Sequence, residues 1–211
     1  MKIKLLITLF LIITIRVSGQ VIDRISFNYG ITSSDLEWNY EQDLTFPIYY
    51  DWGNQKIIGF YSGLDFEYLD SKYFALSTGI GFYQKGAMDG WTQRALKWNI
   101  DYLTFDTKVK VKYDFNNFIP YLIVGPRIDY LLKYSREFDE FARLEMLNKI
   151  DYGLRYGLGM QYDFGKITLG FAWKNNISFN SIVENDGGYM RPPYKINDKT
   201  MIFNIDFGIK M

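Results

Sequence analysis

The chain has 211 residues, and its 24 Lys and Arg equal its 24 Asp and Glu, so the formal net charge is zero and no basic excess favours a nucleic-acid partner. The sequence contains no cysteine and no histidine. These absences exclude a disulfide framework and thiolate chemistry, and they remove the commonest general base and metal ligand. Aromatic residues make up 19% of the chain, a share that suits β-strands and membrane interfaces better than disorder.

The first twenty residues predict a secretory signal peptide. A short positive start precedes an apolar run at residues 5–15, and residues 17–19 are small or apolar near a cleavage point. We expect cleavage to leave one domain, residues 21–211, that begins near Gln20 or Val21. An uncleaved membrane anchor is the alternative, but the apolar run is shorter than the roughly 20 residues that a spanning helix needs.

Beyond residue 21, apolar and polar residues alternate with a period of two, the pattern of β-strands with two different faces. Tight turns and longer polar stretches separate these segments in alternation. We expect eight strands, at residues 22–32, 56–70, 74–82, 100–115, 121–133, 150–162, 167–174 and 199–211.

The hairpin at residues 150–173 shows the pattern most clearly. A tight turn at residues 163–166 joins its two strands. One face carries glycines and isolated charges, whereas the other, on the first strand, carries Ile150, Tyr152, Leu154, Tyr156, Leu158, Met160 and Tyr162. A soluble protein would have to cover this apolar face, and we expect lipid to cover it here.

Four longer stretches connect the other strand ends, at residues 33–55, 84–99, 135–148 and 181–198. The third has apolar residues at a spacing of three, so it forms either a short helix or a loop. Pro126 lies within the strand at 121–133. Because proline cannot donate to the hydrogen-bond ladder, we expect a β-bulge at this position.

Eight strands with three tight turns at one end and four long loops at the other predict an all-β fold, an eight-stranded antiparallel up-and-down transmembrane β-barrel. The alternative is a soluble, lipocalin-like ligand-binding barrel with its apolar face inward. Glycines on the polar face favour a narrow lumen there, and aromatics near the strand ends favour membrane interfaces on the other face. We therefore expect an outer-membrane protein in contact with lipid.

The predicted lumen is lined by charges. Since buried charges must find partners, we expect acids and bases to pair across it. A narrow ion or small-solute channel, or a proton-coupled gate, is the alternative role for the same residues. They are Asp65, Glu67, Asp106, Lys108, Lys110, Lys112, Arg127, Asp129, Asp151, Arg155, Lys174, Asp206 and Lys210.

With these segments laid out, the chain resembles the PorT-like group of small outer-membrane β-barrel proteins, common in Bacteroidota. The resemblance rests on STGIGFYQKG at residues 77–86, on DYLTFDTKVKVKYDF and PYLIVGPRIDYLL within residues 101–132, and on LRYGLGMQYDFGKITLGFAW at residues 154–173. It covers essentially the whole mature chain. The resemblance implies the outer membrane of a Gram-negative cell and leaves the activity open, because barrel folds host many functions.

Catalysis has little support in the sequence. Without histidine, Ser-His and Asp-His mechanisms are excluded. Asp65 and Glu67 share an inward face and could act as acid and base, although a structural role is favoured. We expect no enzymatic activity, no cofactor and no metal site; residues 184–187 come nearest to a calcium loop and are more typical of a turn.

Binding through the loops is the stronger functional hypothesis. Exposed aromatic side chains are typical anchors for a protein or glycan partner, although they can equally pack among themselves. The candidates are Trp38, Tyr40, Tyr49, Tyr50, Trp52, Trp91, Trp98 and Tyr189. A third hypothesis is an accessory subunit of a larger outer-membrane complex, with the lipid face as its interface.

Overall fold

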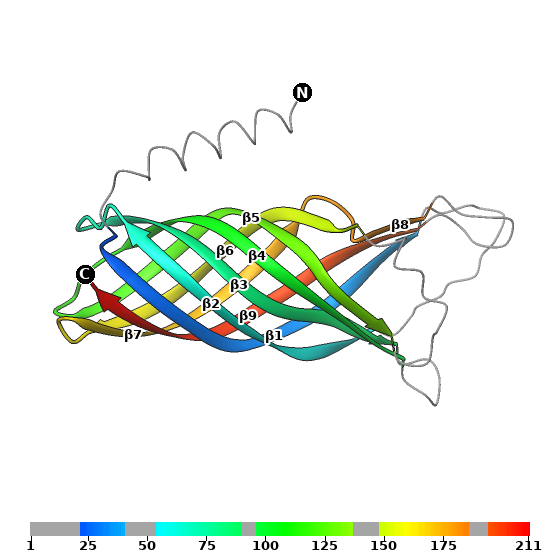
Figure 1. Cartoon of the computed structure of the whole chain (residues 1–211), viewed down its shortest axis with the longest axis horizontal. Coiled ribbons are helices and arrows are strands. Elements are labelled where there is room, and N and C mark those ends of the chain that lie inside the picture. Colours follow the sequence, from blue (N-terminus) through cyan, green and yellow to red (C-terminus); the bar gives the residue numbers. More distant parts are fainter. Residues whose placement is uncertain (1–21, 41–53, 90–95, 137–147, 186–193) are drawn as a thin grey trace, which may run out of the picture.

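The computed structural model describes residues 22–40, 54–89, 96–136, 148–185 and 194–211 (Figure 1). Within them, eight long strands form a barrel wall, and a three-residue strand, β8 (Val183–Asn185), pairs with the last one. The long strands are β1 (Arg24–Tyr40), β2 (Asn54–Tyr68), β3 (Phe74–Asp89), β4 (Leu96–Lys112), β5 (Phe118–Arg136), β6 (Ile150–Asp163), β7 (Ile167–Ser178) and β9 (Tyr194–Lys210).

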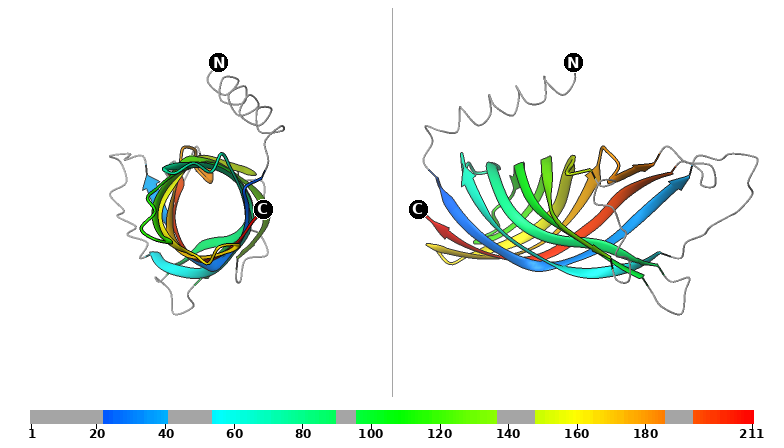
Figure 2. Two further views of the ribbon diagram at one scale, coloured as in Figure 1. Left: turned by 90° about the vertical axis from the view of Figure 1, so that its left-hand side faces the viewer. Right: turned by 45° about the vertical axis from the view of Figure 1, so that its right-hand side comes forward.

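The wall closes on itself. Each long strand pairs antiparallel with its neighbour, and β1 pairs with both β2 and β9. The closing ladder runs from Arg24 opposite Lys210 to Tyr40 opposite Tyr194. Viewed along the axis, the strands form a ring (Figure 2). The predicted eight-stranded antiparallel up-and-down barrel is therefore confirmed.

The two faces of the wall differ sharply. On β1, Phe27 and Tyr29 point outward and are 50% and 58% exposed, whereas Asn28 between them is fully buried. On β6, Leu158 is exposed and Arg155 lies in the lumen. An apolar exterior around a polar interior is the arrangement of a transmembrane barrel, because only lipid can cover such a belt. The lipocalin-like alternative is therefore wrong.

The two ends of the barrel also differ. Tight turns at residues 69–73, 113–117 and 164–166 lie at the same end as the start of β1 and the end of β9 (Figure 1). Asn116 and Asn117 both have positive φ, a conformation that asparagine tolerates better than most residues. Residues 41–53, 90–95, 137–149 and 186–193 connect strands at the opposite end.

Several strands are longer than their alternation predicts, mostly at the end of the long connections, although β5 also starts three residues earlier at the turn end, at Phe118. The expected loop at residues 33–55 shrinks because β1 continues to Tyr40, and the one at 84–99 shrinks because β3 and β4 extend to Asp89 and Leu96. The expected loop at 181–198 contains β8 and the start of β9. At the turn end, by contrast, β4 stops at Lys112 rather than at residue 115.

The predicted bulge at Pro126 is wrong. Pro126 stays in register opposite Leu154 of β6, and the pairing with β4 is interrupted at residues 125 and 126 but resumes without a shift. The irregularity lies further along β5, where Leu131 pairs with Tyr102 and Lys133 with Asp101. One extra residue, Leu132, is accommodated there. The expected helix or loop at 135–148 falls mostly outside the described residues, although β5 reaches Arg136. No helix among the described residues is long and apolar enough to cross a membrane.

Candidate functional site: the charged lumen and the outer rim

The outer half of the lumen, nearer the long connections, contains an apolar layer. Its members are buried side chains from five of the long strands and from the segment that follows β7. They are Tyr61, Tyr83, Ile100, Tyr102, Leu131, Ile182 and Ile202. Side chains rather than open space therefore fill this part of the barrel, as expected for eight strands.

Ile182 reaches this layer through a break in the wall between β7 and β8. Asn148 holds the segment from the start of β6: its backbone N–H donates to the Ile182 carbonyl at 2.8 Å, and its Nδ2 donates to the Ser181 carbonyl at 2.7 Å. Asn180 Oδ1 accepts a hydrogen bond from the backbone N–H of Tyr152 at 2.9 Å. The break thus directs the Ile182 side chain inward, and the hydrogen bonds of Asn148 and Asn180 tie the segment to β6.

An ionic cluster lies beside the apolar layer. Lys85 Nζ is 2.9 Å from Asp151 Oδ2 and 2.9 Å from Asp198 Oδ2, and all three side chains are buried. Arg127 contacts Asp129 and lies 3.3 Å from Asp151. We call these residues the outer cluster. It joins two cations to three carboxylates, and the Tyr83 hydroxyl donates to Asp129.

A second set of pairs occupies the middle of the lumen. Arg155 binds Asp106, and its Nε donates to Asn176 Oδ1 at 2.9 Å. Lys108 Nζ lies 2.7 Å from both Asp65 and Asp106. A Cβ at Gly79 would meet the carboxylates of Asp65 and Asp106, so this glycine leaves the room in which the pairs form.

The inner half, nearer the tight turns, holds a third set. Arg24 Nη2 lies 2.5 Å from Glu67 Oε2, and Lys110 Nζ lies 3.1 Å from the same oxygen. Lys110 also donates to Gln161 Oε1 at 2.9 Å. These contacts cross the lumen, since Arg24, Glu67, Lys110 and Gln161 come from four different strands. Acids and bases of this set therefore pair across the lumen.

Four predicted lumen charges behave differently. Lys112 and Lys210 pair with Asp70 and Asp163 at the rim of the tight-turn end, where both partners keep some solvent contact. They stabilise turns rather than bridge the lumen. Lys174 and Asp206 do point inward, but neither has an ion-pair partner within 4 Å among the described residues.

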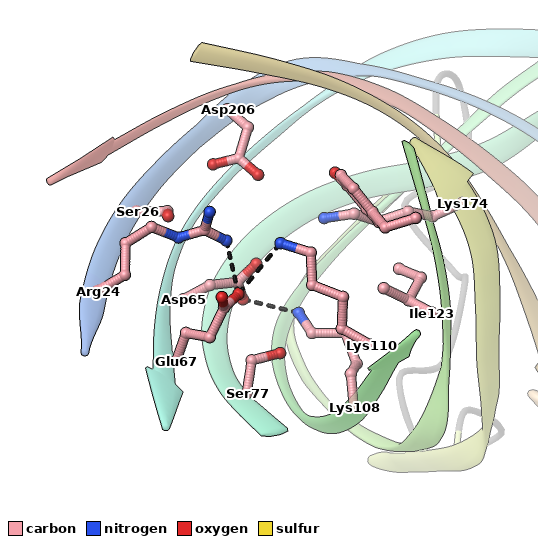
Figure 3. Close-up of a pocket in the computed structure, with 11 residues that line it drawn as sticks. Arg24, Ser26, Asp65, Glu67, Ser77, Lys108, Lys110, Ile123, Lys174 and Asp206 are labelled. Atoms are coloured by element: carbon pink, nitrogen blue, oxygen red, sulfur yellow. Dashed lines mark hydrogen bonds and ion pairs between the residues drawn. The ribbon is translucent and has the colours of Figure 1, made fainter. Parts of the chain in front are cut away.

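A small cavity remains in the inner half, and Lys174 and Asp206 both line it (Figure 3). Its volume is about 20 Å³. Arg24 and Glu67, which lie near strand ends at the tight turns, form its inner side. A cavity of this size holds about one water-sized body, so it is no wide pore.

The sequence-based list of lumen charges missed Arg24, Lys85 and Asp198. Arg24 lies on the inward face of the first predicted strand, where alternation would have found it. Lys85 and Asp198 fall in stretches predicted as loops. Had the inward alternation of β3 been continued beyond Gly81, it would have placed Tyr83 and Lys85 in the lumen.

The proposed acid and base do not form a free pair. Asp65 is held by Lys108, and Glu67 by Arg24 and Lys110. Among the described residues there is no group of three or more acids that could hold a metal ion. Residues 186 and 187 of the nearest calcium-like sequence lie outside the described residues.

Three of the predicted loop aromatics lie on strands instead. Trp38 and Tyr40 belong to β1, opposite Ile196 and Tyr194 of β9, and Trp98 belongs to β4. The strands run on above the membrane because ladder pairing needs no apolar face. The other five, Tyr49, Tyr50, Trp52, Trp91 and Tyr189, fall outside the described residues.

Polar residues mark the point where the exterior leaves the membrane. The apolar belt ends at Ile31 on β1, and the next two outward positions are Ser33 and Asp35. Above this level, we define the outer rim by the outward residues Asp35, Lys56, Asp101, Lys133 and Lys199. The wall continues beyond the outer rim, where β1 runs on to Tyr40 and β4 starts at Leu96.

No protein-family model and no curated protein matches this sequence. Among solved structures, the barrel is similar to outer membrane protein OprG of Pseudomonas aeruginosa, with 12% identity and a TM-score of 0.55 over 92% of this chain and 99% of that one. Neisserial surface protein A has 12% identity and a TM-score of 0.51 over 89% and 97% of the two chains. The outer membrane enzyme PagL matches with 12% identity and a TM-score of 0.43 over 86% and 99%.

Likeness at 12% identity shows the fold alone, and the absence of enzymatic activity stays a prediction. Membrane location follows from the barrel itself: a closed antiparallel wall of even strand number, an apolar belt, short turns at one end and longer connections at the other. These features together identify the chain as an outer-membrane β-barrel protein.

Proposed function

We propose that this protein is a binding or accessory component of the outer membrane, which presents its outer rim and long connections to a protein or glycan partner. The observation that carries the proposal is the extension of the wall beyond the apolar belt. After Ile31 no large apolar residue faces outward on β1 before Asp35, yet β1 continues to Tyr40 in unbroken register with β9.

The size of this extension is considerable. Residues 33–40 extend about 26 Å along the strand at roughly 3.3 Å per residue, or about 20 Å of height at a strand tilt of about 40°. A barrel that only anchored a chain in lipid would need no such wall. A strand wall that rises above the apolar belt suits the display of connecting segments, because binding residues on loops are positioned by the scaffold beneath them.

A channel is the weaker candidate. The apolar layer and the outer cluster lie across the outer half of the lumen, and the inner cavity is only about 20 Å³. We expect the purified barrel to show no steady conductance in planar lipid bilayers. A sustained, reproducible conductance would favour the channel over the binding role.

Site-specific photo-cross-linking in intact cells tests the binding role and locates the contact. Cross-linkers at Lys56 and Lys133 sample the outer rim, and matched cross-linkers at Leu122 and Leu158 sample the apolar belt. We expect one discrete, stoichiometric adduct from the rim and none from the belt. Adducts from the belt alone would favour an accessory subunit held through its lipid face, and adducts from neither would refute the proposal.

The sequence resemblance supports a second, separate proposal, that the chain belongs to the PorT-like group. Two structural features that played no part in the resemblance can test this membership. A member of that group should share the break between β7 and β8 that turns Ile182 inward, and the bulge at Leu132 of β5. A member structure that lacks both features would count against membership.

A further inference from the structure

The inner cavity contains charges that the barrel itself does not balance. Figure 3 shows the amino groups of Lys110 and Lys174 directed toward the side formed by Arg24 and Asp206. Four cations line the cavity, Arg24, Lys108, Lys110 and Lys174, against the three carboxylates of Asp65, Glu67 and Asp206. The lining therefore carries one surplus positive charge.

Most of these charges are already paired. Lys108 holds Asp65 at 2.7 Å, and Glu67 is held by Arg24 at 2.5 Å and by Lys110 at 3.1 Å. Asp65 and Glu67 therefore do not repel an anion as free carboxylates would. Lys174 and Asp206 are the charged residues of the lining that have no ion-pair partner within 4 Å among the described residues.

Of the two, Lys174 is the residue whose buried charged group lacks a hydrogen-bond partner among the described residues. The residue is 3% exposed, and its Nζ has no hydrogen-bond partner among the described residues. The Tyr61 ring, with its centroid 5.1 Å from Nζ, is its cation-π contact. An ammonium group buried without a hydrogen-bond acceptor is costly, so a group that can accept from it is expected nearby.

Asp206 does not fill this role directly. On β9 the residue opposite Lys174 is Ile202, and Asp206 lies opposite Gly170, which precedes Lys174 by four residues on β7. That spacing is about 13 Å along the strand. The two side chains lean toward the same cavity but form no ion pair within 4 Å.

We propose that the cavity binds one small monovalent anion of the halide class, chloride in cells, with Lys174 as its principal ligand. A cavity of about 20 Å³ admits a body of about the size of water and excludes phosphate or a carboxylic acid. The ion enters from the tight-turn end, where Arg24 and Glu67 line the opening side. This site is independent of the outer rim and of the proposed binding role.

Crystals of the detergent-refolded barrel soaked in bromide provide the direct test, because bromide replaces chloride and scatters anomalously. We expect one anomalous peak within hydrogen-bond distance of Lys174 Nζ. K174M should abolish the peak. K112M is the matched control, since Lys112 pairs with Asp70 at the rim and does not line the cavity, and it should retain the peak.

A solution measurement separates a bound ion from one present only at crystal concentration. The thermal midpoint of the refolded barrel is compared in chloride and in gluconate at equal ionic strength. We expect chloride to raise the midpoint of the wild type and of K112M, and to leave K174M unchanged. The apparent dissociation constant should rise at least tenfold in K174Q, which keeps a polar group, and should fall severalfold in D206N, which removes a carboxylate from the lining.

The outcomes that overturn the proposal are distinct. An ordered water in the cavity without a bromide peak would show that the cavity holds water and no anion. A bromide peak without any chloride-specific shift in solution, or a peak that persists in K174M, would equally refute the site. None of these results bears on the cross-linking test of the outer rim.

Discussion

Lys85 provides the sharpest test of the ionic lumen. Its ammonium group is fully buried, lies 2.9 Å from both Asp151 and Asp198, and sits 4.0 Å from the centroid of the Tyr102 ring. K85M removes the charge and keeps much of the apolar stem. The change leaves Asp151 and Asp198 with Arg127 as their remaining cation, at 3.3 and 3.6 Å.

The expected cost follows from this geometry. Removing one partner of a buried pair costs about 3–5 kcal/mol, because the other charge stays buried and uncompensated. Arg127 still compensates part of the carboxylate charge, so we expect K85M to lower the free energy of unfolding by about 3 kcal/mol, the lower end of this range. Adding D198N to K85M removes the surplus carboxylate, so the double variant should be more stable than K85M alone, with a coupling of about 1–3 kcal/mol.

Urea unfolding of barrels refolded in lipid vesicles measures these differences, with the folded fraction read from the migration of unboiled samples on gels. K112M is the control, since its partly exposed pair with Asp70 should contribute no more than about 1 kcal/mol. If K85M were as stable as K112M, or if D198N added to K85M lowered stability further, the outer cluster would not carry the role assigned to it.

Three further predictions address the faces, the apolar layer and the N-terminus. L158R should cost about 2–4 kcal/mol if Leu158 faces the bilayer midplane, whereas F164R, in a tight turn, should cost at most about 1 kcal/mol; equal urea midpoints would contradict the assigned faces. I182A should cost about 2–5 kcal/mol by cavity formation yet produce no steady bilayer conductance, because the outer cluster still fills the lumen. N-terminal sequencing of protein from outer-membrane fractions should begin near Gln20 or Val21, and a start at Met1 would show that the leader is retained.

Alternation in the sequence predicts the membrane part of the fold well. On β6 and β7 each residue assigned to the lipid face points outward, and each residue assigned to the lumen points inward. This works because the bilayer imposes a strict contrast between the two faces. Above the outer rim no lipid requires an apolar outward face, so the pattern that marks a membrane strand ends there, and strand ends such as Tyr40 and Tyr194 are mistaken for loop.

The sequence does not predict which charged residues form ion pairs with one another. Alternation places Lys174 and Lys108 in the lumen. It cannot show that Lys108 has two carboxylates within 4 Å, whereas Lys174 has none at that distance among the described residues. Nor does local sequence indicate that Ile182 turns inward between two strands. Both depend on neighbours far away in the chain.

The sequence by itself determined the eight long strands, the face that meets lipid and the inward position of most charges, since these follow from a local period of two; the order of tight turns and long connections determined the strand directions. Only the tertiary structure decided which charges meet, because closure of β1 on β9 sets the register of the wall. That register places Arg24 beside Glu67 and Lys85 beside Asp198, and it leaves Lys174 facing a cavity.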